Sequence, residues 1–144
     1  MDKKEMTSKE YLQQIRADDL RIEQKIKEYE SLMSRKASLV GMDYTVDRVQ
    51  TSPDGTGFTK IVDRLVDLQQ EINDDIDAFC DSQHKKISEI HKLSKPEYIE
   101  VLFKRYVEGQ ALEQIAADMG YSYNWCCHIH GEALKEFEKV RNFP

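Results

Sequence analysis

The sequence predicts an all-α protein, in which a long N-terminal antiparallel helical hairpin precedes a C-terminal three-helix domain with a helix-turn-helix. Apolar residues recur at helical spacing along two long stretches. The 144 residues include only 6 Gly and 3 Pro, so little interrupts long helices. Near the C-terminus, a glycine-containing turn joins two shorter helical stretches. We therefore expect a hairpin over 1-93, with a connecting loop at 40-58, and a helix-turn-helix domain over 94-144.

The first long helix is expected from Thr7 to about Lys36, with Ser8 as its cap. One apolar seam follows it close to heptad spacing, broken at Asp19. The seam consists of Tyr11, Leu12, Ile15, Ile22, Ile26, Tyr29, Leu32 and Met33. A stripe of this length needs a partner helix to cover it.

The connection at 40-58 contains Pro53-Asp54-Gly55, three residue types that strongly favour a turn. The segment Asp47–Ser52 precedes it and is interpreted as a polar loop, because the glycine spacing does not match a phosphate-binding loop. The sequence assigns this segment no role.

The second long helix is expected from Thr59 to about Lys92, paired with the first. Its apolar positions are Ile61, Leu65, Leu68, Ile72, Ile76, Phe79, Ile87 and Ile90. Acidic residues crowd its middle, and we interpret them as a solvated face rather than as a DNA mimic or a site for a basic partner. Since two helices leave part of each stripe uncovered, a homodimer is expected.

The C-terminal domain begins after Leu93-Ser94-Lys95, with Pro96 at the first helical position. The next helix carries an apolar stripe at i, i+3, i+4 and i+7, and Ala111 stands where a capping Ser or Thr would serve better. Gly120 follows at the left-handed cap, and Ser122 can cap the last helix. The stripe residues are Leu112, Ile115, Ala116 and Met119, and those of the last helix are Cys126, Ile129, Ala133, Phe137 and Val140.

The run Leu112-x-x-Ile115-Ala116-x-x-x-Gly120-x-Ser122-x-x-x-Cys126, with Glu132-Ala133-Leu134-x-x-Phe137, resembles region 4 of bacterial sigma-70 factors. More specifically, it is similar to small bacteriophage proteins of Gram-positive hosts, the autolysin-regulator type of late transcriptional regulators. The resemblance implies a phage-encoded transcriptional regulator that binds promoter DNA, alone or together with host RNA polymerase. The alternative is an interaction module that docks on RNA polymerase or another host protein without gripping DNA tightly.

The last helix would turn one face to the major groove. With Cys126, Ile129, Ala133 and Phe137 buried, Asn124, His128, Gly131 and Lys135 lie opposite, with Cys127 beside them. The resemblance places base-reading positions at Tyr123, Asn124, Cys127 and His128. Asn can pair with adenine, His can donate to guanine and Tyr can touch a thymine methyl. Trp125 is expected to pack on the first helix of the domain or on a partner, or else to contact sugar and phosphate.

The charge argues for weak DNA binding by the isolated protein. The net charge is −6, and residues 95-144 carry six Lys or Arg against eight Asp or Glu. No Lys or Arg lies between Ser122 and Glu132. Because phosphate contacts supply much of the affinity for DNA, a partner would have to contribute the rest.

Cysteine and histidine near the same helix suggest a metal site, but the spacing does not support one. Cys127 or Cys126 could share a metal with His130, whereas closed zinc sites need four ligands and no second cluster exists. We therefore expect no metal, no cofactor and, lacking a catalytic constellation, no enzyme. Without an apolar leader or membrane span, the chain is expected in the bacterial cytoplasm.

Overall fold

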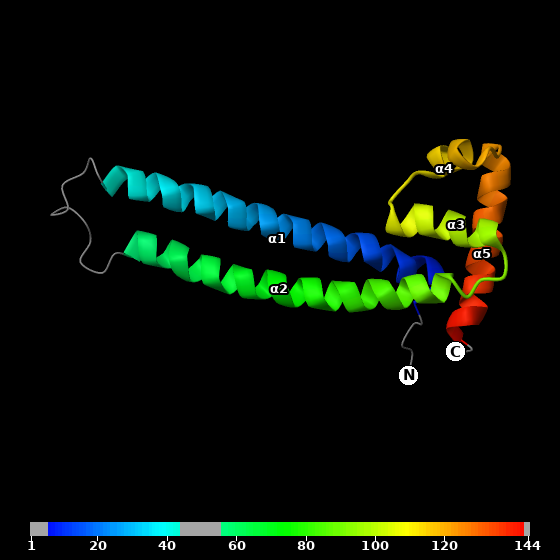
Figure 1. Cartoon of the computed structure of the whole chain (residues 1–144), viewed down its shortest axis with the longest axis horizontal. Helices are drawn as coiled ribbons and strands as arrows, with labels where there is room; N and C mark the ends of the chain where they lie inside the picture. Colours follow the sequence, from blue (N-terminus) through cyan, green and yellow to red (C-terminus); the bar gives the residue numbers. More distant parts are fainter. Residues whose placement is uncertain (1–5, 44–55, 143–144) are drawn as a thin grey trace. The chain divides into compact units, whose positions relative to one another are not determined.

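The computed structural model describes residues 6-43 and 56-142. In these residues every regular element is helical, which confirms the all-α prediction (Figure 1). The elements are α1 (Ser8–Asp43), α2 (Thr56–Ile90), α3 (Pro96–Leu102), a π-helical turn η2 (Phe103–Val107), α4 (Leu112–Met119) and α5 (Tyr123–Asn142).

The chain divides into two compact units, and the division is not the one expected from sequence. The terminal unit consists of residues 1-19 and 79-144, and the middle unit of residues 20-78. The expected boundary between residues 93 and 94 therefore lies inside the terminal unit. The reason is that the first turns of α1 and the last turns of α2 share one core cluster with α3, η2 and α5.

The bounds of the two long helices also differ from expectation. α1 continues to Asp43 and α2 begins at Thr56, so the connection is narrower than 40-58. The segment Asp47–Ser52 and the turn Pro53-Asp54-Gly55 lie outside the described residues.

The cap of α1 is Thr7, and the prediction that Ser8 caps it is wrong. The Thr7 hydroxyl oxygen accepts a hydrogen bond from the Glu10 backbone N–H at 3.2 Å, and the same hydroxyl donates to the Glu10 carboxylate at 3.0 Å. Ser8 is buried, and its hydroxyl donates instead to the carboxylate of Glu138 on α5. This bond lowers the pKa of Glu138.

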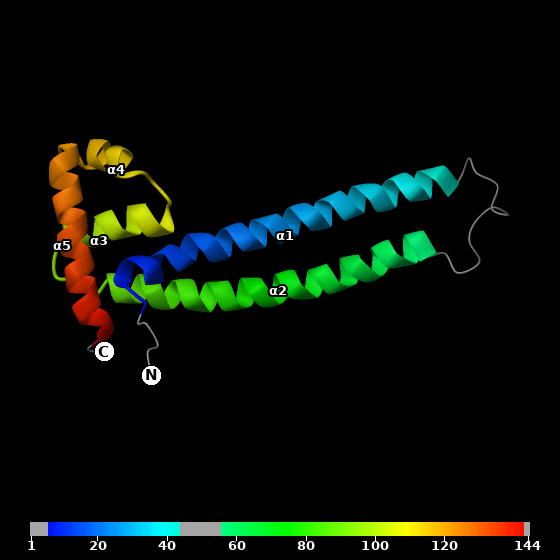
Figure 2. The same cartoon turned by 180° about the vertical axis from the view of Figure 1, so that it is seen from behind.

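The main core of the terminal unit joins both ends of the chain. α5 packs beside the start of α1 and the end of α2, as the reverse view in Figure 2 also shows. Phe137 of α5 has no exposed surface, and neither has Leu12 of α1. The buried members are Leu12, Ile15, Ile90, Leu93, Leu102, Tyr106, Ala133 and Phe137.

A second core cluster holds α3, α4 and α5 together. It consists of Val101, Ile115, Ala116, Cys126 and Ile129, with Leu112 and Met119 partly buried at its edge. The apolar stripe predicted for residues 112-119 is therefore the inner face of α4, as expected.

In the middle unit, α1 and α2 run antiparallel (Figure 1). Their apolar seams are only partly buried. Ile22, Leu65 and Leu68 are buried as predicted. Ile26 and Ile76 remain 36% and 37% exposed, because two helices cover only part of each apolar stripe.

Candidate nucleic-acid interface

The turn between α4 and α5 is built by Gly120 and Ser122. Gly120 has φ 72° and ψ 29°, a left-handed conformation that a side chain disfavours. The Tyr121 N–H closes the turn by donating to the Ala116 carbonyl at 2.8 Å. The Ser122 hydroxyl oxygen then accepts from the Trp125 N–H at 3.1 Å. Both capping roles agree with the predictions from sequence.

The inner face of α5 is the predicted one. Cys126, Ile129, Ala133 and Phe137 are all buried. The Cys126 thiol donates to the Leu112 carbonyl oxygen at 3.6 Å, which ties α5 to the start of α4. Burial raises the pKa of this thiol. Cys126 is thus a packed, protonated residue of the core.

The outer face begins with the first two turns of α5. Tyr123 is 48% exposed, and Asn124 and His128 are also exposed. Cys127 is half-buried, and its hydrogen bond with Tyr123 raises the pKa of the Tyr123 hydroxyl. Gly131 is half-buried and presents no side chain. Of the six residues predicted to bind DNA, the four with exposed side chains are Tyr123, Asn124, His128 and Lys135.

Trp125 belongs to this outer face, although the predicted set left it out. It is 49% exposed, and its indole stacks on the His128 ring with centroids 5.1 Å apart and planes 28° apart. Trp125 belongs to neither core cluster of the terminal unit, so it does not pack on the first helix of the domain, and its expected contact with a partner or with sugar and phosphate stays a prediction. The three-residue spacing of Trp125 and His128 was the signal that could have indicated the pair.

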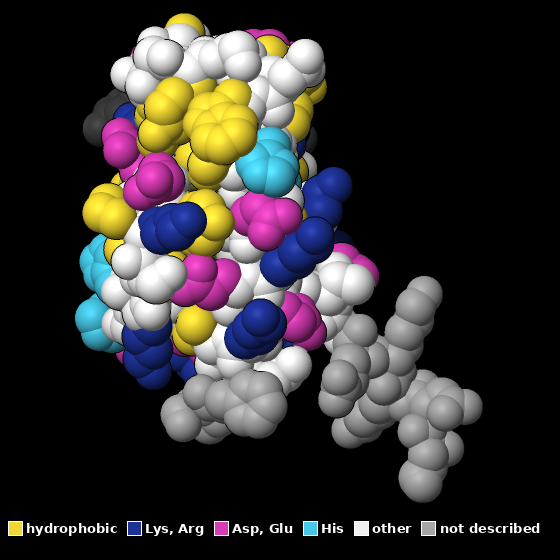
Figure 3. Space-filling view, turned by 90° about the vertical axis from the view of Figure 1, so that its right-hand side faces the viewer, with side chains coloured by type: hydrophobic (Ala, Val, Ile, Leu, Met, Phe, Trp, Pro, Cys, Tyr) yellow, Lys and Arg dark blue, Asp and Glu magenta, His cyan; other side chains and the backbone are white. Residues whose placement is uncertain are grey.

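Two lysines of the terminal unit are paired with acids, whereas Lys139, four residues after Lys135 on the same side of α5, is exposed. Lys135 Nζ lies 3.4 Å from Glu132. Lys104 lies 4.0 Å from both Glu100 and Glu108. Figure 3 shows hydrophobic side chains and a histidine gathered toward one end of this side of the molecule, with basic and acidic side chains intermingled below them. The face is therefore aromatic and polar rather than strongly basic.

Behind the outer face, His130 connects α5 to η2. Its Nε2 lies 2.8 Å from the Tyr106 hydroxyl oxygen, and the two rings stack with centroids 5.7 Å apart. Burial, reinforced by the nearby charges of Arg105 and Lys9, lowers the pKa of His130 to about 4. His130 is therefore a neutral structural residue at physiological pH. Among the described residues, no group of three or more His, Cys, Asp or Glu is arranged to hold a metal ion.

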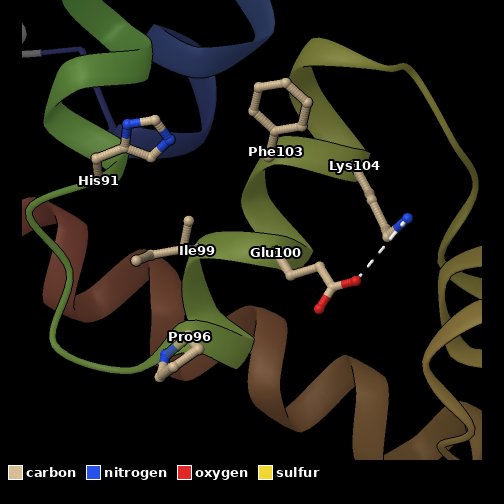
Figure 4. Close-up of a pocket in the computed structure, with 6 residues that line it drawn as sticks. All are labelled: His91, Pro96, Ile99, Glu100, Phe103 and Lys104. Atoms are coloured by element: carbon tan, nitrogen blue, oxygen red, sulfur yellow. Dashed lines mark ion pairs between the residues drawn. The ribbon is translucent and has the colours of Figure 1, made fainter.

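A separate open groove lies where α2 ends and α3 begins (Figure 4). It has a volume of about 400 Å³ and is lined by His91, Pro96, Ile99, Glu100, Phe103 and Lys104. The Glu100–Lys104 pair stands at one end of it. None of the predicted DNA-binding residues lines this groove.

Comparison with protein-family models, curated proteins and solved structures finds no match to this chain. Among the helices that the structure describes, none combines the length and apolar character needed to cross a bilayer.

Proposed function

We propose that α3, α4 and α5 form a sigma region 4-like helix-turn-helix and that the protein is a phage-encoded transcriptional regulator that reads promoter DNA with α5. The observation that carries the proposal is the division of α5 into two faces. Its inner face is closed by Cys126 and Ile129, while Asn124 and His128 project from the first two turns on the outside. The glycine turn ahead of α5 and the resemblance of residues 112-137 support the same assignment.

The chemistry of the outer face suits the major groove, which admits an α-helix and displays distinct donors and acceptors for each base pair. The Asn124 amide can bond to N6 and N7 of adenine, and a His128 ring N–H can donate to guanine. The stack with Trp125 fixes the plane of the His128 ring, which reduces the entropy lost on binding. Lys135 can contact a phosphate if it leaves Glu132.

A second function is favoured by the charge and by Trp125. An exposed indole is typical of the anchor residues of protein interfaces, and no Lys or Arg between Ser122 and Glu132 is available to contact phosphate. In this alternative, the outer face docks on RNA polymerase or another host protein and does not bind DNA tightly.

The test begins with footprinting across the phage genome, in the presence and absence of purified RNA polymerase from a Gram-positive host. Binding to a protected site is then measured for Asn124→Ala and His128→Ala at two salt concentrations. Each variant should lose ~1–3 kcal/mol of specific binding per lost base contact. Because both side chains are exposed, stability should change by less than ~0.5 kcal/mol.

Asn142→Ala is the matched control, because it makes the same substitution at an exposed position in the last turn of α5. It should bind DNA like the wild type. If Asn124→Ala and His128→Ala bind DNA normally but no longer bind the polymerase, DNA reading by α5 is refuted and the interaction module replaces it.

A further inference from the structure

The middle unit has two chemically different sides, and ion pairs join α1 and α2 along one of them. At about 100° per residue, Lys25 falls on one side of the buried Ile22 and Ile26 on the other. Lys25 Nζ lies 2.6 Å from Asp75 and 3.7 Å from Glu71 of α2. The hydrogen bond with Asp75 raises the pKa of Lys25. Charged side chains thus bridge the two helices on this side.

The other side holds a groove of about 210 Å³ between the same two helices. Its lining residues are Ile26, Tyr29, Gln69, Ile72 and Asn73, with no Asp, Glu, Lys or Arg among them. We refer to it as the uncharged groove.

An uncharged row on α2 runs past this groove at alternating steps of four and three residues. Its members are Val62, Val66, Gln69, Asn73 and Ile76. Val66 is 62% exposed and lies one turn before Gln69 of the groove on the same helix, so an exposed apolar side chain and a recess share one surface.

We propose that a second copy of this chain covers the uncharged groove, with the two copies related by a twofold axis and α2 facing α2. A twofold interface uses the same surface patch on both copies. This patch must therefore contain both a projecting side chain and the groove that receives the same side chain of the other copy. Val66 of the partner subunit would enter the groove of the first copy, and Val66 of the first copy would enter the groove of its partner.

The size of the surface fits a dimer. The helical part of the middle unit is roughly 35 Å long at ~1.5 Å per residue, and two helices side by side are roughly 20 Å wide. Each copy could therefore bury on the order of 700 Å², close to the ~800 Å² per partner of a standard interface.

The charge distribution distinguishes this occupant from a basic partner. Of the six acidic side chains in residues 63-77 of α2, Glu71 and Asp75 are paired with Lys25 on the other side, whereas Asp63 and Asp77 lie within about 60° of Val66 around the helix. A basic partner would be drawn to those acids and released by salt. Two copies instead bring their acidic margins together around an uncharged centre, so salt should tighten the dimer by screening the repulsion.

The test is sedimentation equilibrium of the full chain at two salt concentrations, up to tens of micromolar. The wild type should approach twice the monomer mass of 16.9 kDa, and more completely at high salt. Val66→Asp should remain monomeric, while Val66→Leu should still dimerise. Ser31→Asp is the control, because it adds the same charge at an exposed position on the side of α1 away from Ile22.

Circular dichroism shows whether each variant keeps its helix content, which Val66→Asp should because the side chain is mostly exposed. The proposal is overturned by a wild type that stays monomeric at both salt concentrations, by a folded Val66→Asp that dimerises normally, or by a dimer that salt dissociates. It does not depend on the proposed function, because none of these measurements involves DNA.

Discussion

Replacing Leu12 with Ala should destabilise the part of the protein that carries α5, although Leu12 lies near the other end of the chain. The Leu12 side chain has no exposed surface and belongs to the same core cluster as Phe137 and Tyr106. Truncation of a buried leucine costs the lost apolar transfer and leaves a cavity, together ~2–5 kcal/mol. Since Leu12 is fully enclosed, we expect a value in the upper half of that range.

The measurement is urea unfolding followed by the fluorescence of Trp125, the only tryptophan, and by circular dichroism. Leu20→Ala is the control, because it makes the same substitution on α1 where the side chain is 53% exposed, and it should cost less than ~1 kcal/mol. The reasoning fails if Leu12→Ala and Leu20→Ala lower the unfolding free energy equally. It also fails if the Trp125 transition of Leu12→Ala matches that of the wild type.

Two further predictions concern the terminal unit. Because the folded-state pKa of His130 is lowered from 6.5 to about 4, the unfolded chain takes up a proton that the folded chain does not, so stability should be full above pH 6.5 and fall as the pH drops toward 4. A pKa shift of this size corresponds to ~3 kcal/mol of unfolding free energy, and solvent screening of the partly exposed ring reduces it to ~1–2 kcal/mol. The measurement is the unfolding free energy against pH for the wild type and for His130→Gln. An identical pH dependence in the two proteins would contradict the prediction. Ala111→Asp should stabilise the protein by ~1 kcal/mol in thermal or urea unfolding, because Ala111 has extended N-cap geometry and no side-chain cap bond for α4, and an unchanged midpoint would show that water already satisfies those N–H groups.

The parts of the fold that follow from local rules were predictable. The inner face of α5 follows from spacing alone, because residues three and four apart share a helix face. Gly120 follows from the requirement for positive φ at a left-handed cap. These features depend only on neighbours within about two helical turns.

The surroundings of Tyr11 could not be predicted, because they bring together three distant segments. Its hydroxyl donates to Glu89 at 2.6 Å, and its ring lies 4.9 Å from Lys86 Nζ and 4.6 Å from Arg141 Cζ. Lys86 is only 3% exposed, although a lysine in an amphipathic helix is ordinarily a surface residue. Burial lowers the pKa of its amine.

The candidate site was predictable only in part, for a related reason. The exposure of Asn124 and His128 could be predicted because they lie opposite the apolar stripe. The contact of His130 with Tyr106 depends on η2, where the Glu108 N–H donates five residues back to the Phe103 carbonyl at 3.1 Å. A π-helical turn shifts the following residues around the helix axis, and an average helical period does not reveal it.

The joining of Ser8 to Glu138, 130 positions away, has a consequence for how the protein is made. A ribosome releases the first turns of α1 long before it has translated the residues against which they pack. Leu12 and Ile15 therefore remain without their final neighbours while nearly the whole chain is synthesised. The terminal unit can be completed only after translation of α5, so its assembly should be a late event, and the nascent chain should expose this apolar surface to chaperones until then.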